Sequence, residues 1–179
     1  MFEEYLQDAH DFYEIGRKAS LIGNEKESRR YYRVTIMCAS CAMEAFVNYI
    51  ASSFAEAKNI DKIEISFLND QELQFVVGKG VTTRIRYNAV DEKIKALIFR
   101  FIPDFDFNAS ISWNNFKIFK DFRDSLIHSR KVEDETPIND YEKRIKEGLT
   151  SIIELMNEIS KGMFRKPLRK KILDLTPDK

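Results

Sequence analysis

The stretch Val34–Phe54 reads VTIMCASCAMEAFVNYIASSF and decides the fold, because it is apolar on nearly every side of a helical wheel. Such a helix lies at the centre of a bundle or crosses a membrane. The stretch contains Glu44 and Asn48 and is short for a membrane span, so a buried core helix is the better interpretation. We expect it to be the second half of a longer helix over residues 25–57, whose first part is charged.

The composition of the whole chain fits one helical domain. The 179 residues include 29 basic and 29 acidic ones, which excludes disorder over most of the chain and gives no overall positive field for nucleic acid. Six Gly and four Pro are too few for an all-β fold with many tight turns. Any contact with nucleic acid must therefore come from a local basic patch.

Four further segments carry apolar residues at helical spacing, namely 2–22, 91–101, 113–129 and 138–162. We therefore expect an all-α bundle of four to five main helices over residues 1–162, with an irregular insertion between the second and fourth of them. Within that insertion, 68–77 reads as a short helix, whereas 81–87 is β-prone and favours a small hairpin. Residues 163–179 are expected to form a basic C-terminal tail, since 161–171 carries six basic residues and no acid.

The sequence favours a cytoplasmic protein without metal or cofactor. The acidic start MFEEY is not a secretory signal, and no stretch favours a membrane span. Cys38 and Cys41 have the Cys-x-x-Cys spacing of a redox pair, but both lie inside the apolar helix, where small buried packing residues are the better interpretation. The chain also lacks a phosphate-binding loop and the ligand spacing of a zinc site.

Glu44 is the only charged residue of the apolar stretch, and Ser40, Asn48 and Ser52 place polar groups one turn apart on the same side of the helix. A buried carboxylate needs a partner that compensates its lost hydration. The stripe is either a structural hydrogen-bond ladder that fixes the helix register or part of a functional site. The residues themselves leave both interpretations open.

A second unusual residue is Arg123, which falls in the middle of the apolar stripe of the 113–129 helix. A guanidinium in that position needs a buried acceptor, and Glu44 is the candidate. His128 follows five residues later, and Asp124 stands one helical turn before it, where the two side chains can share a hydrogen bond. His128 is also readily explained as a surface residue at a helix C-terminus, where cations are favoured.

The segments Arg123-Asp124-Ser-Leu-Ile-His128 and Met43-Glu44-Ala-Phe-Val-Asn48 together resemble the HEPN superfamily, the higher eukaryote and prokaryote nucleotide-binding domains. That family consists of helical bundles with an Arg-to-His motif. The resemblance implies a metal-independent endoribonuclease, often of a toxin–antitoxin or phage-defence system, that acts as a homodimer. It further implies that Arg123 and His128 are catalytic, that Asp124, Glu44 and Asn48 support them, and that a second copy supplies the second His.

The resemblance also bears on partners and leaves other functions open. Arg130 and Lys131, with the basic tail, are expected to hold the RNA backbone. Two alternatives fit the same resemblance: an inactive module that dimerises or binds a partner protein such as an antitoxin, and a nucleotide-binding domain that works with a separate nucleotidyltransferase. The inactive module is favoured by acidic residues around the motif, which repel phosphate: Asp121, Asp124, Glu133, Asp134 and Glu135. A cleft that gathers Arg123, Arg130 and the tail lysines would favour the nuclease.

Overall fold

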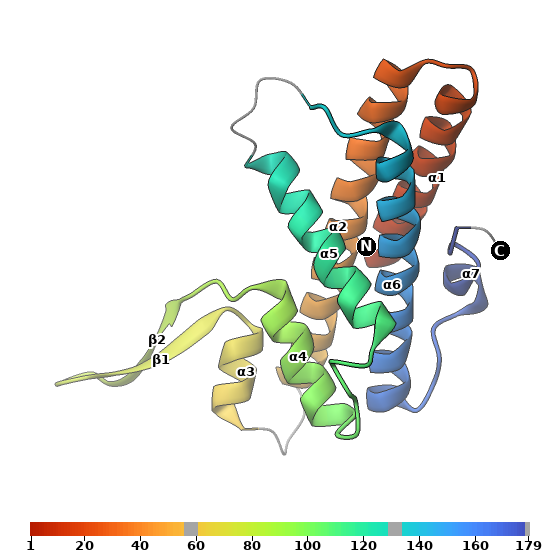
Figure 1. Cartoon of the computed structure of the whole chain (residues 1–179). Helices are drawn as coiled ribbons and strands as arrows, with labels where there is room; N and C mark the ends of the chain where they lie inside the picture. Colours follow the sequence, from red (N-terminus) through yellow and green to blue (C-terminus); the bar gives the residue numbers. More distant parts are fainter. Residues whose placement is uncertain (56–60, 129–133, 178–179) are drawn as a thin grey trace.

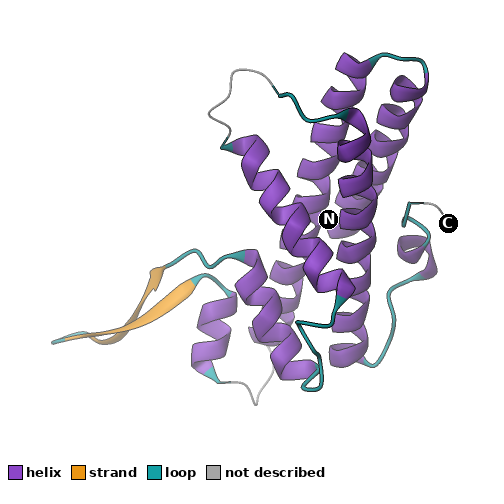
Figure 2. Cartoon of the chain, viewed as in Figure 1, coloured by secondary structure: helices purple, strands orange, loops and turns teal. Residues whose placement is uncertain are grey.

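The computed structural model describes residues 1–55, 61–128 and 134–177. The described residues form a bundle of helices from which a single hairpin projects (Figure 1). In chain order the elements are α1 (Phe2–Leu21), α2 (Glu25–Ala55), α3 (Lys62–Leu68), β1 (Gln71–Val76), β2 (Gly80–Ile85), α4 (Val90–Phe101), α5 (Ile111–Ile127), α6 (Ile138–Phe164) and α7 (Lys170–Leu173). Figure 2 shows that helices make up most of the described structure. The expected all-α bundle is confirmed, with α1, α2, α4, α5 and α6 as its main helices.

Helix α2 is the core helix of the bundle. It packs against α1, α4, α5 and α6, and its fully or almost fully buried side chains include Ile36, Met43, Phe46 and Ile50. Close approach between neighbouring helices depends on small residues. A Cβ at Gly148 of α6 would overlap the ring of Phe119 on α5, so this glycine permits the contact between the two helices.

One side of α2 nevertheless faces solvent, contrary to the expectation of burial all round. Cys41, Glu44, Asn48, Tyr49 and Ser52 are all exposed. By length and composition α2 is the one helix of the described residues that could cross a membrane, but about half of that span is buried inside the bundle. The packing of α2 against α1, α3, α4, α5 and α6 is that of a core helix in a compact protein.

The insertion between α2 and α4 contains α3 and an antiparallel hairpin, in which Leu73 pairs with Thr83 and Phe75 with Val81. The expected hairpin is confirmed, but the short helix expected over 68–77 is wrong, because β1 occupies 71–76. Apolar and polar residues alternate along β1, which suits a strand, and Gly78 and Gly80 adopt positive φ at the turn. The hairpin stands away from the bundle (Figure 1).

The basic tail is folded against the bundle. Ile172 is 2% exposed, and the backbone N–H of Leu168 donates to Oδ1 of Asn157 on α6 at 3.0 Å. Glu3 on α1 accepts hydrogen bonds from Arg169 and pairs with Lys171. In Figure 1 this tail lies on the opposite side of α6 from the hairpin. The tail is therefore held by α1 and α6.

Candidate functional site

The two residues singled out on α2 and α5 are in contact. Nη2 of Arg123 donates to Oε1 of Glu44 at 3.1 Å, and Nη1 lies 3.1 Å from Oδ1 of Asp124. The Arg123 side chain is 20% exposed and that of Glu44 is 49% exposed. The predicted partnership is therefore confirmed, whereas the expected burial of Glu44 is wrong, because its carboxylate lies at the open side of α2.

Arg123 is positioned by the apolar stripe of α5. The N-cap Ser110 starts this helix by accepting from the backbone N–H of Trp113, and Phe116, Phe119 and Phe122 bury the face that packs on the core. Arg123 follows Phe122 directly, is partly buried and lines the pocket. Its Nε is buried without a hydrogen-bond partner. A guanidinium has five N–H donors, so this one retains unused capacity.

Two lysines, each paired with carboxylates, lie in the same region as Arg123. Nζ of Lys93 lies 2.6 Å from Oδ2 of Asp70 and 3.5 Å from Oδ1 of Asn48, and the residue is only 4% exposed. Lys120 lies between Asp91, at 3.6 Å, and Asp124, at 3.5 Å. Asn48, expected as a supporting residue, thus faces Lys93 of α4.

Apart from Asp91, these side chains line a pocket of about 280 Å³ that is open to solvent. Its walls come from α2, α4, α5 and the base of the hairpin, so the insertion supplies part of the site. Its charged lining consists of three carboxylates and three cations, namely Glu44, Asp70, Asp124, Lys93, Lys120 and Arg123. The formal charge of the lining is therefore balanced. A small polar ligand, rather than a bare multiply charged anion, suits such a pocket best.

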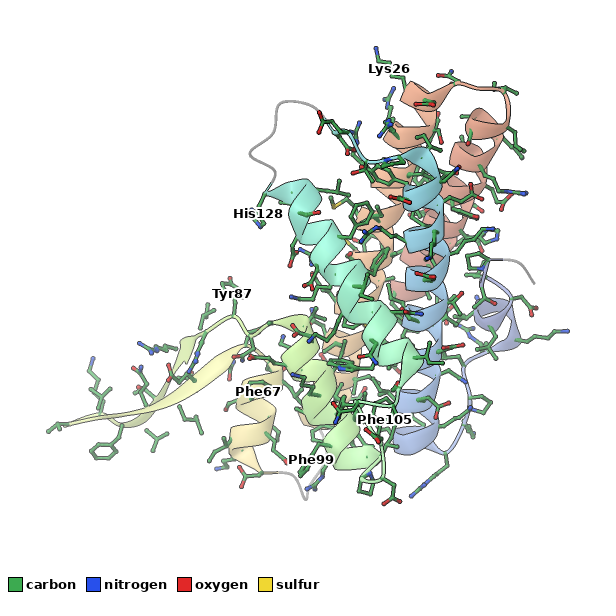
Figure 3. All side chains as sticks on the ribbon, in the orientation of Figure 1. Lys26, Phe67, Tyr87, Phe99, Phe105 and His128 are labelled. Carbon is green, nitrogen blue, oxygen red and sulfur yellow. The ribbon has the colours of Figure 1, made fainter. Side chains whose placement is uncertain are left out.

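His128 is the C-cap of α5 and does not line the pocket itself. Its backbone N–H donates to the carbonyl of Asp124 at 2.9 Å, and its side chain is exposed at the end of the helix (Figure 3). Its ring makes no hydrogen bond or ion pair with other described residues, so the expected contact with the Asp124 carboxylate is absent there. That carboxylate pairs with Arg123 and Lys120 instead. His128 is free to meet a ligand.

The basic tail does not line this pocket. Arg130 and Lys131 lie outside the described residues. Among the tail bases, Arg169 and Lys171 are paired with Glu3, whereas Arg123 lies on α5. The described part of the chain therefore brings together Arg123, Asp124, Glu44 and Asn48 without the tail.

Sequence reasoning missed the residues that the insertion and α4 contribute to the pocket. The role of Lys93 could have been predicted, since Val90, Ile94 and Leu97 place it on the apolar side of its helix, where a lone cation needs a partner. The roles of Asp70 and Tyr87 could not, because their positions depend on how the hairpin attaches to the bundle.

The cysteines are not the buried pair that the sequence suggested. Cys38 is half-buried and Cys41 is exposed. Burial raises the pKa of the Cys38 thiol, and desolvation followed by the nearby Glu44 carboxylate raises the pKa of Cys41. A raised pKa lowers the fraction of reactive thiolate, which disfavours redox chemistry.

Comparison of the chain with protein-family models, curated proteins and solved structures finds no match. Among the described residues, no group of three or more His, Cys, Asp or Glu is arranged to hold a metal ion.

Proposed function

We propose that this chain is a cytoplasmic, metal-independent endoribonuclease of the HEPN type, with Arg123 and His128 as its catalytic residues. One observation carries the proposal. The Arg123 guanidinium is fixed at the wall of a solvent-open pocket, and His128 is exposed one helical turn beyond Asp124, which lines the same pocket. The type of reaction is inferred from the resemblance of the motif to HEPN nucleases.

The proposed chemistry is attack of a ribose 2′-OH on the adjacent phosphate. That step needs a base for the hydroxyl proton, an acid for the leaving oxygen and a cation for the charged phosphorane. Arg123 fits the last task, because its planar fork binds phosphate oxygens in a bidentate manner. His128 serves as base or acid, and His128 of a second copy takes the other role in a two-fold dimer.

Glu44 and Asp124 act as positioning residues in this proposal. Each takes one terminal nitrogen of the guanidinium, at 3.1 Å, and together they restrict the orientation of the planar group. Preorganised donors stabilise developing charge without reorganisation during the reaction. The same carboxylates also offset the charge of Arg123, so the phosphate must contact donors that they leave unused.

An inactive interaction module is the second candidate, and one observation favours it. The carboxylates of the pocket equal its cations in number, so the site offers no net positive charge to a phosphate. In this alternative the exposed end of α5 binds a second copy or a partner protein, such as an antitoxin encoded nearby. The nuclease is preferred, because nothing among the described residues covers His128.

The two candidates are separated by incubating purified full-length protein with end-labelled RNA in EDTA. The nuclease predicts fragments that end in a 2′,3′-cyclic phosphate, because the 2′-OH is the nucleophile. Wild-type protein that leaves varied RNAs intact, free of bound partner, would favour the module.

A further inference from the structure

Tyr87 stands out among the aromatic residues at the surface. The residue is 86% exposed, yet it lines the same pocket as Arg123 and Asp124. In Figure 3 it rises from the loop between β2 and α4, away from the hydrophobic core. An aromatic ring in this position contributes little to the core and is available to a ligand.

The backbone on both sides of Tyr87 is held in place. The N–H of Arg86 donates to the carbonyl of Asp70 at 2.8 Å, and the N–H of Asn88 donates to Oδ1 of Asp70 at 2.9 Å. The side-chain amide of Asn88 donates to the carbonyl of Phe67 at 2.8 Å. Asp70 is itself fixed by the buried Lys93. The Tyr87 ring is therefore presented on a rigid support.

The remaining lining specifies the chemistry of the ligand. A balanced set of carboxylates and cations, with Asn48 and Asn88 between them, offers both donors and acceptors. The volume of about 280 Å³ is just below the usual range for drug-sized ligands, about 300–1,000 Å³. A neutral, flat, polar group of modest size is the best match. Nucleobases have these properties, and stacking on an exposed aromatic ring is a common way to bind unpaired bases.

We propose that the pocket binds one unpaired nucleobase of single-stranded RNA, stacked on Tyr87, and thereby places the attached phosphate near the end of α5. This inference rests on the proposed ribonuclease function. Asp124 lines the pocket, and His128 follows it by one helical turn. The insertion of α3 and the hairpin thus supplies the substrate-positioning wall of the site.

The test is binding of a fluorescein-labelled, 2′-O-methylated RNA hexamer, which cannot be cleaved through its 2′ oxygen, measured by fluorescence anisotropy with the full chain. Tyr87→Ala should weaken binding about tenfold, as expected for loss of one base–aromatic stack. Tyr87→Trp should retain binding. Phe75→Ala is the matched control, since Phe75 is an aromatic residue of the adjoining hairpin, 77% exposed, that does not line the pocket. This control should leave affinity unchanged.

Two further probes make the result specific. With one abasic position placed where the bound base lies, the difference between wild type and Tyr87→Ala should disappear. The tenfold difference should also persist between about 50 and about 200 mM salt, because stacking does not depend on counterion release as phosphate contacts do.

Equal affinities of Tyr87→Ala and Phe75→Ala for the hexamer would overturn the base pocket, as would a wild-type protein that does not bind it. Equal affinities of the two variants would leave the ribonuclease proposal standing if natural RNA is still cut. Binding that depends on Tyr87, in a protein that never cuts RNA, would support the pocket and refute the nuclease.

Discussion

Arg123 of α5 and Glu44 of α2, which are 79 residues apart in the chain, are joined by a hydrogen bond of 3.1 Å at the wall of the charged pocket. The contact links the two segments that resemble the HEPN motif. It also forms part of the pocket wall, because both residues line the pocket.

The energetic value of this contact is modest. The Glu44 carboxylate is 49% exposed, and Arg123 keeps Asp124 as a second partner. We expect Glu44→Ala to lower the free energy of unfolding by about 0.5–1 kcal/mol, the range of exposed ion pairs. Urea denaturation measures this change. A loss above about 3 kcal/mol would mean that the carboxylate behaves as a buried charge.

The pair of Lys93 and Asp70 should matter far more. The Lys93 side chain is 5% exposed and that of Asp70 is 26% exposed. Asp70→Asn should cost about 3 kcal/mol, because it leaves a buried ammonium without its counter-charge, and Asn tolerates the positive φ of this position. Lys93→Met should cost less, since the remaining carboxylate can be hydrated. A larger loss of unfolding free energy for Lys93→Met than for Asp70→Asn in urea denaturation would contradict this assignment.

The docked tail should respond to acid. The hydrogen bond from Arg169, with Lys171 beside it, lowers the pKa of Glu3 below its ordinary value of 4.5. A lowered folded-state pKa means that the stabilisation is complete above the unfolded-state value and is lost as the pH falls through the lower folded-state value. The melting temperature of wild type should therefore approach that of Glu3→Gln on acidification. A gap between the two that stays constant from neutral pH to pH values well below 4.5 would refute the contribution of Glu3.

The bundle could largely be predicted from the sequence, because apolar spacing reports directly on which residues a helix buries. The helices over 2–21, 90–101, 111–127 and 138–164 agree with the expected segments within a few residues. The strand β1 was missed, although Leu73 and Phe75 alternate with polar residues as in a strand, because Gly78 and Gly80 end a helix as readily as they turn a hairpin.

The site was only partly predictable. A helical wheel shows that Glu44 needs a partner, and Arg123 was the right one. It does not show which side of α2 the other helices leave open, so the burial of Glu44 and of Cys41 was wrong. Asp70 and Tyr87 reach the pocket through the attachment of the hairpin, which depends on long-range hydrogen bonds that local patterns do not encode.

A two-fold dimer is expected, with α5 near its axis, because a single His128 cannot hold both proton-transfer roles. Sedimentation equilibrium at micromolar concentration should give twice the chain mass of 21.0 kDa. Ile118, an exposed residue of α5, provides a probe: Ile118→Glu should shift the protein toward monomer, whereas Ile15→Glu on α1 should not. A wild-type monomer would contradict the composite site.

RNA cleavage in EDTA, with the wild type and with His128→Ala, tests whether the protein is a metal-independent ribonuclease. Wild-type protein should produce fragments with 2′,3′-cyclic phosphate ends, and His128→Ala should abolish cleavage at an unchanged melting temperature, because His128 is exposed at a helix end. Arg123→Lys should also lose activity, since a point charge does not replace the bidentate fork. Cleavage by His128→Ala at the wild-type rate would contradict the catalytic role of His128.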